Sequence, residues 1–178
     1  MKTKKIVITG GPGTGKTSII KNLEEKGQVC LHEISRQVTL EAQRKGISQL
    51  FLKDPLLFSE LLLEGRIRQY KEAGMMRSEI VFLDRGIPDV VAYMDYFGNK
   101  YPSVFGEACK DYGYDMVFIL PPWEEIYIPD NERYESYHQA VDIHRHLARA
   151  YKNCGYTTIE LPKETLENRT AFILEKIS

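Results

Sequence analysis

The sequence predicts a three-layer α/β domain, in which helices cover both faces of a parallel sheet of five strands. Short apolar runs alternate with segments of helical periodicity, and glycine or proline marks most boundaries between them. Two of the runs, 80–83 and 116–120, are apolar at every residue. Strands that are covered on both faces show this pattern, whereas half-solvated strands alternate. Such an alternation of strands and helices is typical of a layered α/β domain.

The first half of the chain is expected to contain two strands and three helices. The strands are expected at 6–9 and 29–32, and the helices at 17–26, 35–45 and 54–73. Asp54 followed by Pro55 is a typical helix start, because the aspartate accepts a hydrogen bond from the first turn and proline has no N–H to satisfy. Gly27, Gly46 and Gly74 mark the ends of these helices.

The second half is expected to contain three more strands and four helices. The strands are expected at 80–83, 116–120 and 156–161, and the helices near 88–97, near 102–112, up to about 153 and at 164–177. The segment from 121 to about 133 is irregular. The chain shows no repeat, low-complexity tract or linker, so residues 1–178 are expected to form a single domain.

The charges and the cysteines limit the expected partners and compartment. The 178 residues include 24 Lys and Arg against 25 Asp and Glu, which gives a net charge of −1. Without a basic stretch, small molecules are expected as partners rather than nucleic acid or an anionic membrane surface. Cys30, Cys109 and Cys154 are widely spaced in the sequence and form no CxxC pair, as expected of reduced thiols in the cytoplasm.

Long apolar segments are missing from the sequence. No run approaches 18 apolar residues, so no membrane span is expected. The basic residues at 2–5 are followed by only a few apolar residues, which are too few for a signal peptide. The start of the chain is therefore expected to be part of the fold.

The glycine-rich segment 10–17, GGPGTGKT, carries the most specific motif. Gly10, Gly15, Lys16 and Thr17 satisfy the pattern G-x-x-x-x-G-K-[ST] between a predicted strand and a predicted helix. In such a loop the backbone N–H groups and the helix N-terminus bind phosphates, the lysine reaches the terminal phosphates and the hydroxyl holds Mg²⁺. The residues expected to contact the nucleotide are Gly11, Pro12, Gly13, Thr14, Gly15, Lys16, Thr17 and Ser18. The other interpretation is an ordinary glycine-rich turn.

Two other segments of the sequence limit which class of nucleotide-binding protein this can be. A guanine-specific switch protein would carry Asn-Lys-x-Asp, but Asn99 and Lys100 are followed by Tyr101 and Pro102. A motor-type ATPase would usually end its acidic strand in Asp-Glu, whereas here the third strand ends in Asp84 followed by a basic residue. An acid followed by a base suits a small-molecule kinase better.

Asp84 and Arg85 are expected beside the glycine-rich loop. Ligands bind at the carboxyl ends of the strands in such sheets, so Asp84 can hold Mg²⁺ there and Arg85 can bind a substrate phosphate or hydroxyl. Alternatively, Asp84 caps the next helix and Arg85 is solvated.

Glu33 closes the second predicted strand in the equivalent position, within HEISR at 32–36. An acceptor hydroxyl loses its proton as it attacks a phosphorus atom, so a carboxylate within reach is useful. Glu33 is the candidate base. Alternatively, it is a helix N-cap partner and Arg36 is a surface charge.

These motifs resemble the P-loop nucleotide-kinase-like family that contains the ribosylnicotinamide kinase domain of the bacterial NAD regulator and the TRP-channel translocation-defect proteins. More distantly, the chain resembles the deoxynucleoside and adenylate-type kinases. The resemblance covers nearly the whole chain, in the segments GGPGTGKT, HEISR, FLDRG, PDNERYE and GYTTIELPKETLENR. It implies an adenylate-kinase-like sheet with strand order 2-3-1-4-5 and a lid over ATP near 121–137. The family is biochemically mixed, so the resemblance does not fix the substrate.

The resemblance also suggests cationic side chains around ATP. A closing lid contributes arginines that neutralise the transferred phosphoryl group, and Arg133 is the only Lys or Arg from 121 through 137. Either Arg133 acts, with Arg145 or Arg149 as possible helpers, or it only pairs with its acidic neighbours. Arg169 would pass close to the adenine as a stacking partner, or lie on a solvated helix face.

Some other polar residues are weaker candidates. His138, His144 and His146 lack the spacing of a metal site, and His144 shares an apolar helix face, so packing is expected. Arg66, Arg68 and Gln69 either line an acceptor pocket or form a solvated edge. Trp123 and Tyr127 either stack on a planar group or anchor the lid.

Taken together, the residues predict an ATP-binding, Mg²⁺-dependent P-loop protein that transfers the γ-phosphoryl group to a hydroxyl of a nucleoside-like or other small metabolite. The alternative is a nucleotide-gated ATPase or binding module that recognises a protein or an anionic ligand without phosphorylating it.

Overall fold

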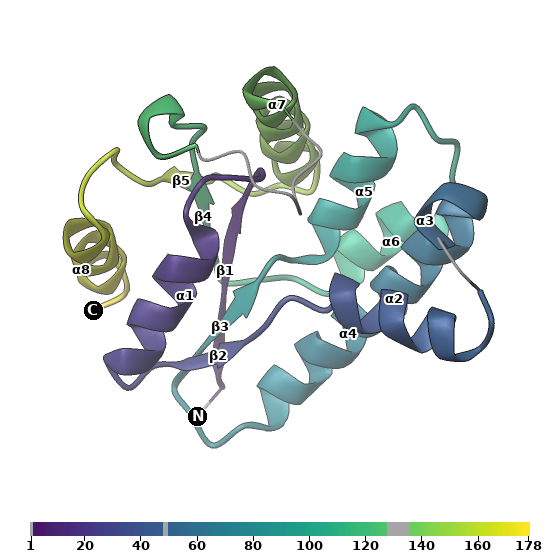
Figure 1. Cartoon of the computed structure of the whole chain (residues 1–178). Coiled ribbons are helices and arrows are strands. Elements are labelled where there is room, and N and C mark those ends of the chain that lie inside the picture. The colour runs from purple at the N-terminus through teal and green to yellow at the C-terminus, as the bar shows by residue number, and fades with distance from the viewer. Residues whose placement is uncertain (1, 48–49, 128–135) are drawn as a thin grey trace.

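A parallel sheet of five strands forms the middle layer of the computed structural model, which describes residues 2–47, 50–127 and 136–178. The strands are β1 (Lys4–Gly10), β2 (Val29–Leu31), β3 (Ile80–Asp84), β4 (Met116–Leu120) and β5 (Ile159–Glu160). Their order is β2-β3-β1-β4-β5, and every pair is parallel. The expected strand order and three-layer α/β class are confirmed (Figure 1).

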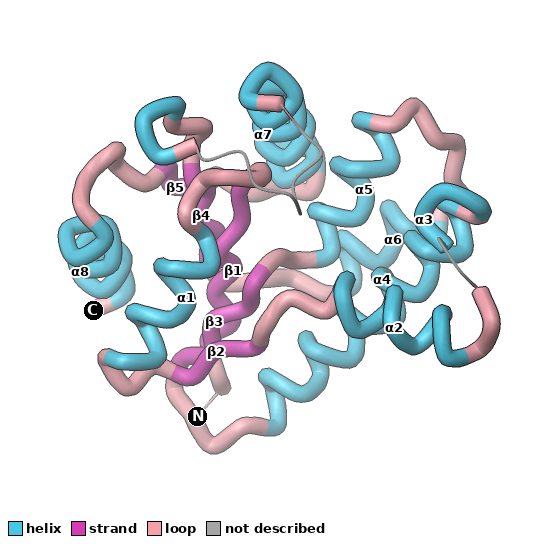
Figure 2. Tube along the Cα trace, in the orientation of Figure 1, coloured by secondary structure: helices cyan, strands magenta, loops and turns pink. Residues whose placement is uncertain are grey.

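Helices cover both faces of this sheet (Figures 1 and 2). They are α1 (Lys16–Glu25), α2 (Ser35–Arg44), α3 (Leu50–Lys53), α4 (Pro55–Met75), α5 (Ile87–Tyr96), α6 (Val104–Asp111), α7 (Tyr137–Asn153) and α8 (Leu166–Ile177). A short 3₁₀ helix, η1 (Glu124–Ile126), follows β4. Helices α1 and α8 lie together on one side of the sheet, and α4, α5 and α7 lie on the other. Among the described residues, none of the helices is both long and apolar enough to cross a bilayer.

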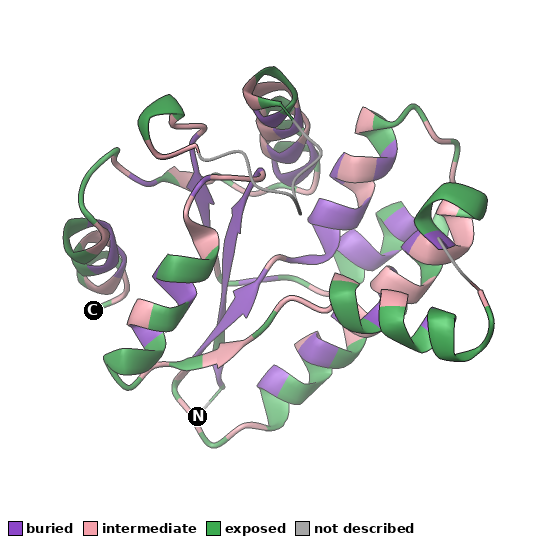
Figure 3. Ribbon diagram, in the orientation of Figure 1, coloured by how far each residue is buried: buried purple, intermediate pink, exposed green. Residues whose placement is uncertain are grey.

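The central strand β1 divides the core into two parts, because its side chains alternate between the faces of the sheet. Ile6 and Ile8 pack with residues of α1 and α8, including Ile20 and Ile173. Val7 packs on the opposite face with residues of α4, α5, α6 and α7. All of β1 after Lys4 is buried, and the buried strands lie inside the partly exposed helices (Figure 3). Such two-sided burial explains the uniformly apolar strands.

Four elements differ from the expectations. Helix α4 continues through Gly74 to Met75, so Gly74 does not end it, because a glycine within a helix costs only about 0.5–1 kcal/mol. Helix α3 and helix η1 were not predicted, because each is too short to show helical periodicity. Strand β5 covers Ile159–Glu160 rather than 156–161. The backbone N–H of Tyr156 donates to Tyr151 O at the end of α7, and its hydroxyl accepts from Tyr114 N at 2.9 Å. Tyr156 therefore belongs to the turn after α7 and not to the sheet.

Asp89 on α5 is the most connected buried carboxylate of the described chain. Its Oδ1 accepts from Thr9 Oγ1 of β1 at 2.6 Å, and its Oδ2 accepts from Tyr151 Oη of α7 at 2.5 Å and from Gly86 N at 2.9 Å. Asp89 is 2% exposed, so water cannot replace these donors. Burial and the neighbouring Asp89 raise the pKa of Tyr151, which therefore stays a donor. This network fixes the start of α5 relative to β1 and α7.

The change Tyr151→Phe tests this network. It removes one donor to a buried carboxylate and keeps the ring, so we expect it to lower the free energy of unfolding by about 1–2 kcal/mol. Tyr112→Phe is the matched control, since the Tyr112 ring packs edge-on against Tyr70, and its loss should stay below about 0.5 kcal/mol. Urea unfolding monitored by circular dichroism measures both changes. Equal stabilities of the two variants would contradict the assigned role of Tyr151.

Candidate active site

The glycine-rich loop connects β1 to α1, as the motif requires. Gly13 and Gly15 have φ angles of 72° and 85°, a backbone region that suits glycine. A Cβ atom on Gly10 would lie 2.9 Å from Leu120 Cβ, so this position tolerates no side chain without a shift. The predicted arrangement of strand, loop and helix is therefore present.

The N-terminus of α1 opens at the end of this loop. Its N-cap, Gly15, provides no side-chain cap, and the first turn contains no acidic residue. The first N–H groups of a helix lack partners within the helix and carry a partial positive charge, so this end suits an anion. Thr17 and Ser18 lie on the first turn, whereas Thr14 is buried and donates its hydroxyl to Gly11 O at 2.9 Å. Thr14 thus contributes to the loop through its backbone.

Lys16 and Asp84 lie side by side between the loop and the end of β3. Lys16 Nζ is 3.4 Å from Asp84 Oδ1, and both side chains are largely buried. Burial lowers the pKa of Lys16, and the nearby Arg85 lowers it further, while Asp84 opposes the shift. Apart from this ion pair, Asp84 Oδ1 is buried and accepts no hydrogen bond from a described residue. Both groups are therefore positioned for additional charged partners at the end of β3.

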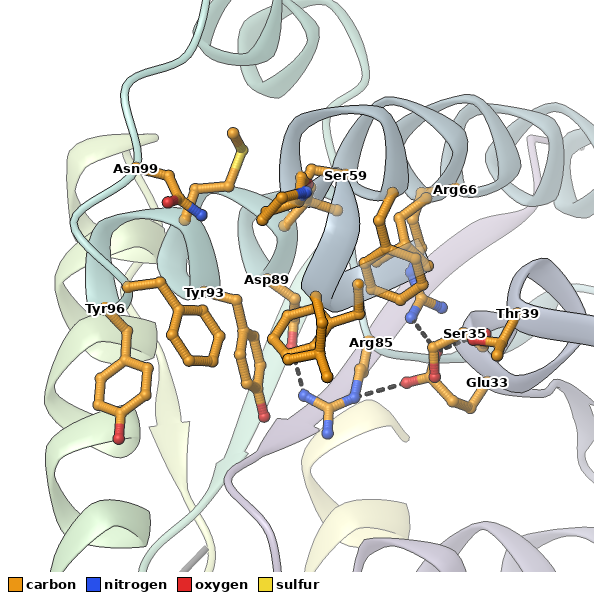
Figure 4. Close-up of a pocket in the computed structure, with 18 of the residues that line it drawn as sticks. Glu33, Ser35, Thr39, Ser59, Arg66, Arg85, Asp89, Tyr93, Tyr96 and Asn99 are labelled. Atoms are coloured by element: carbon orange, nitrogen blue, oxygen red, sulfur yellow. Dashed lines mark hydrogen bonds and ion pairs between the residues drawn. The ribbon is translucent and has the colours of Figure 1, made fainter. Parts of the chain in front are cut away.

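Glu33 lies at the centre of an ion-pair cluster that joins three elements (Figure 4). Its Oε1 contacts Arg66 Nη2 of α4 at 2.5 Å, and its Oε2 contacts Arg85 Nε at 2.5 Å. Oε1 also accepts from the backbone N–H groups of Ile34 and Ser35, at 2.8 and 3.0 Å. Glu33 therefore caps the start of α2, as the alternative interpretation held, and also lies between two arginines.

The pKa of Glu33 is set by these contacts. Burial alone would raise it, but Arg66 and Arg85, with the Ser35 N–H, lower it to about 2. Glu33 is therefore ionised at neutral pH. It accepts a hydrogen bond readily, but it holds a proton weakly.

Arg85 has an unusual backbone conformation, with a φ angle of 75°. Among the described residues, it is the only one other than glycine with positive φ, a region that costs energy for side chains with a Cβ. Its side chain is 16% exposed and contacts Glu33 and, at 3.3 Å, Asp89 Oδ1. Burial opposes its charge, but Tyr93, Glu33 and Asp89 raise its pKa. Arg85 is thus a paired cation and not a solvated one, and Asp89, not Asp84, receives the N–H at the start of α5.

A cleft of about 820 Å³ opens beside Glu33 and Arg85 (Figure 4). It lies between residues of α2, α3, α4 and α5, and the first turn of α7 adds Gln139. Its aromatic lining residues are Phe51, Phe58, Tyr93, Tyr96 and Phe97. This volume lies in the range of small-molecule sites. The end of the sheet that carries Glu33 and Arg85 therefore borders a cavity that is large enough for a small molecule in addition to a ligand at the glycine-rich loop.

For Arg66 and Gln69 the sequence allowed two positions, an acceptor pocket or a solvated edge. In the structure, both belong to the ion-pair cluster around Glu33. Arg66 lines the cleft and donates to Asp84 O at 2.8 Å and to Gln69 Oε1 at 3.2 Å. Gln69 donates to His32 O at 2.6 Å. Together they tie α4 to the ends of β2 and β3. Arg68, in contrast, is exposed.

Arg169 lies under the loop. Its Nη2 donates to Thr14 O at 3.1 Å, and the residue is only 4% exposed. Its guanidinium carbon is 5.9 Å from the centroid of the Trp123 ring. The interpretation as a solvated helix face is therefore wrong. Its expected contact with adenine stays a prediction.

The expected lid is described only in part. Arg133 lies outside the described residues, which stop at 127 and resume at 136. Before this gap, the Tyr127 ring lies against Gly13. A Cβ atom on Gly13 would be only 2.5 Å from Tyr127 Cδ2. Arg145 pairs with Asp142 at 3.0 Å on the exposed side of α7.

Metal ligation by histidine finds no support in the described part of the chain, which contains no group of three or more His, Cys, Asp or Glu residues arranged to hold a metal ion. His144 lies on α7, 3.9 Å from Glu160, with 17% of its side chain exposed, and burial lowers its pKa. It is thus mostly packed, as expected.

Sequence reasoning missed Asp89 and the aromatic side chains of α5. Asp89 follows Arg85 by four residues, the spacing of one helical turn, and this was the available signal. Tyr93 and Phe97 continue the same spacing and both line the cleft. The side of α5 that faces the cleft therefore carries Asp89 at its start and aromatic side chains towards and just after its end.

The lowered pKa of Glu33 predicts a pH-dependent contribution to stability. As the pH falls, Glu33 in the unfolded chain, with a pKa of 4.5, is protonated at a higher pH than Glu33 in the folded protein. The contribution of ionised Glu33 to the free energy of unfolding is therefore present above pH 4.5 and is lost as the pH falls towards 2. We therefore expect Glu33→Gln to be less stable than the wild type at pH 7, with a smaller difference at pH 3. Urea unfolding at both pH values measures this difference.

Glu41→Gln is the control for this experiment, because Glu41 is exposed on α2, the helix that begins two residues after Glu33, and accepts a hydrogen bond from Gln37 at 2.9 Å, which glutamine can also accept. Its stability should differ little from the wild type at either pH. A Glu33→Gln difference that is the same at pH 7 and pH 3 would contradict the lowered pKa.

Comparison with known proteins supports the architecture. The chain is similar to deoxyadenosine kinase from M. mycoides, with a TM-score of 0.70 and 18% identity over 97% of this chain and 98% of that chain. It is similar to thymidylate kinase from Candida albicans, with a TM-score of 0.71 and 15% identity over 99% and 91% of the two chains. It also matches NadR protein in complex with NR, with a TM-score of 0.73 and 19% identity over 98% of this chain but 50% of that one. These similarities show a shared fold.

In sequence, the chain is 25% identical over 142 residues to the nucleoside-triphosphatase THEP1 of Aquifex aeolicus (strain VF5), which covers 66% of this chain and 77% of that protein. A family model described as an AAA domain matches residues 5–169, which include the loop, Glu33, Asp84 and Arg169. The chain therefore belongs to this AAA-domain family, a nucleotide-binding P-loop family with a kinase-like fold.

Proposed function

We propose that this protein is an ATP-dependent phosphotransferase, which moves the γ-phosphoryl group of ATP to a hydroxyl group of a small molecule bound in the cleft. One observation carries the proposal: a carboxylate that is held ionised by two arginines, Glu33, lies where the cleft meets the residues beside the phosphate loop.

The phosphate end of ATP would lie along 11–18, at the N-terminus of α1. Lys16 is positioned to reach the terminal phosphates, and burial strengthens its electrostatic interaction with them. Arg85, although paired with Glu33 and Asp89, would contribute positive charge near the transferred group. In a loose transition state, where charge spreads over the equatorial oxygens, fixed cations of this kind supply most of the catalysis.

The residues present also fit a magnesium ion. Apart from its ion pair with Lys16, Asp84 Oδ1 is buried and accepts no hydrogen bond from a described residue, and Thr17 lies on the first turn of α1. One carboxylate and one hydroxyl, completed by phosphate oxygens and water, form a usual ligand set for Mg²⁺ bound with a nucleotide. When bound, the ion would neutralise phosphate charge. Thr17 and Asp84 would hold it, and Lys16 would keep Asp84 in place.

Glu33 would orient the acceptor hydroxyl and receive its proton. With a pKa of about 2 it is a weak base, but it is ionised and accepts a hydrogen bond from the attacking hydroxyl at any physiological pH. In a loose transition state the proton leaves late, so orientation matters more than basicity. Deoxyadenosine kinase and the NadR complex with NR, both similar in fold, support an acceptor of nucleoside type.

A second candidate is a nucleoside triphosphatase or a nucleotide-gated binding module. The similarity to a nucleoside-triphosphatase favours it. In that case, water replaces the acceptor in the cleft, and Glu33 supports α2 rather than a reaction.

A transfer assay distinguishes these functions. The protein is mixed with Mg-ATP and a panel of nucleosides, and the products are weighed by mass spectrometry. The proposal predicts a product heavier by one phosphate, and a rate of formation that falls about 10²-fold or more in Glu33→Gln while ATP affinity stays unchanged. Glu41→Gln, an exposed change on the neighbouring helix α2, should retain the wild-type rate. Release of ADP and phosphate with every acceptor unmodified would favour the second candidate.

Placement of the phosphates is tested by Gly13→Ala against Gly27→Ala. Both glycines have positive φ, 72° and 80°, so Gly27→Ala should destabilise the fold by about 1–2 kcal/mol, and Gly13→Ala by more, because its methyl group also forces Tyr127 to move. A new methyl group meets nothing within 4 Å at Gly27, but at Gly13 it meets Tyr127 on the surface of the loop. We therefore expect only Gly13→Ala to weaken Mg-ATP binding, by tenfold or more in calorimetry. Unchanged affinity in this folded variant would place the phosphates elsewhere.

A further inference from the structure

The charged groups that line the cleft balance one another. Four charged side chains of the described chain line it, Glu33, Asp89, Arg66 and Arg85, two of each sign. Arg66 and Arg85 both pair with Glu33, and Arg85 also pairs with Asp89. The floor of the described cleft is therefore close to neutral, although it contains two arginines.

The hydrogen-bonding edges of these arginines are also occupied. Arg85 uses Nε for Glu33 and Nη1 for Asp89, so neither edge of its guanidinium presents two open nitrogens. Arg66 uses Nη2 for Glu33 and Nη1 for Asp84 O and Gln69. An arginine binds a phosphate most strongly when one guanidinium donates two parallel N–H bonds to it. Neither arginine offers that pair to a ligand in the cleft.

The walls of the cleft favour a flat, uncharged molecule. Phe51 stacks edge-on with Phe58 and Phe97, at centroid distances of 5.6 and 5.2 Å, and Tyr93 lies with its ring 5.3 Å from the Arg85 guanidinium carbon. Figure 4 shows the rings of Tyr93 and Tyr96 of α5 among the residues that line the cleft. Aromatic walls bind planar rings by stacking, but they do not replace the water that an anion loses on entry.

Neutral polar groups complete the lining. Ser35, Thr39, Gln43, Ser59, Asn99 and Gln139 supply hydroxyl and amide groups. Such groups bind the hydroxyls and ring heteroatoms of an uncharged ligand, and they fix its orientation. The described lining therefore combines stacking surfaces, neutral donors and acceptors, and one ionised carboxylate for a hydroxyl.

From this balance we infer that the acceptor is an uncharged molecule of nucleoside type, with a planar ring and a free hydroxyl, and that the cleft discriminates against the corresponding monophosphates. The inference deepens the proposed function and rests on it for the reaction, but the class of ligand is measurable by binding alone. Proteins of similar fold include both a deoxyadenosine kinase and a thymidylate kinase, and the inference favours the nucleoside type of acceptor over the monophosphate type.

Binding of matched pairs tests the inference. Adenosine and AMP, guanosine and GMP, cytidine and CMP, and thymidine and TMP are titrated by calorimetry into protein saturated with Mg²⁺ and a non-hydrolysable ATP analogue, which fills the phosphate loop. We expect at least one nucleoside to bind ten or more times as tightly as its monophosphate, and Tyr93→Ala to weaken that binding tenfold or more. Monophosphates that bind as tightly as their nucleosides, or nucleosides that do not bind, would overturn the inference.

A charge change in the cleft tests its cause. Glu33→Gln leaves the lining with one net positive charge, so the affinity ratio of monophosphate to nucleoside should rise at least threefold. Glu41→Gln changes the net charge equally, on the neighbouring helix α2 but outside the cleft, and should leave the ratio unchanged. An unchanged ratio in folded Glu33→Gln would overturn the charge argument.

Two further readouts keep the tests independent. In the wild type, nucleoside affinity should change less than twofold between 50 and 500 mM salt, since an interaction between opposite charges would weaken with salt. A steep salt dependence would count against an uncharged ligand even if the variant failed to fold. Nucleoside binding without phosphoryl transfer would refute the proposed function and leave the ligand class standing.

Discussion

The ion pairs of Glu33 with Arg66 and Arg85 hold the whole site together. They join the ends of β2 and β3 to α4, and through Asp89 they continue to α5, β1 and α7. Each group is largely withdrawn from water, so removing any one leaves a buried charge without its partner, which is costly. The same contacts keep Glu33 ionised, and Arg85 makes them from a backbone with positive φ. Stability and the geometry proposed for the reaction therefore depend on the same side chains.

Much of the fold could be predicted from local pattern. The strands 80–83 and 116–120 and the phosphate loop were identifiable because burial on both faces and phosphate binding each impose a local choice of residues. Strand β5 was shorter than expected and α3 was missed, since the docking of Tyr156 and a helix of one turn leave no periodic signal. Arg133 and most of the expected lid lie outside the described residues.

The candidate site was less predictable than the fold, because its contacts are distant in sequence. Glu33 and Arg66 are separated by 33 residues, and Thr9 and Asp89 by 80. No periodicity indicates such a pair before the strand order is known. The sequence could place Glu33, Asp84 and Arg85 at one edge of the sheet, but it could not show that Arg85 is paired on both sides or that Arg169 supports the loop from below.

The position of Trp123 has a practical consequence. It is the single tryptophan of the chain, and it lies against Arg169, whose guanidinium holds the carbonyl of Thr14 in the phosphate loop. Indole emission responds to nearby charge, so the molecule contains an intrinsic optical reporter one residue removed from its nucleotide loop. We therefore expect occupancy of that loop to change the emission of Trp123.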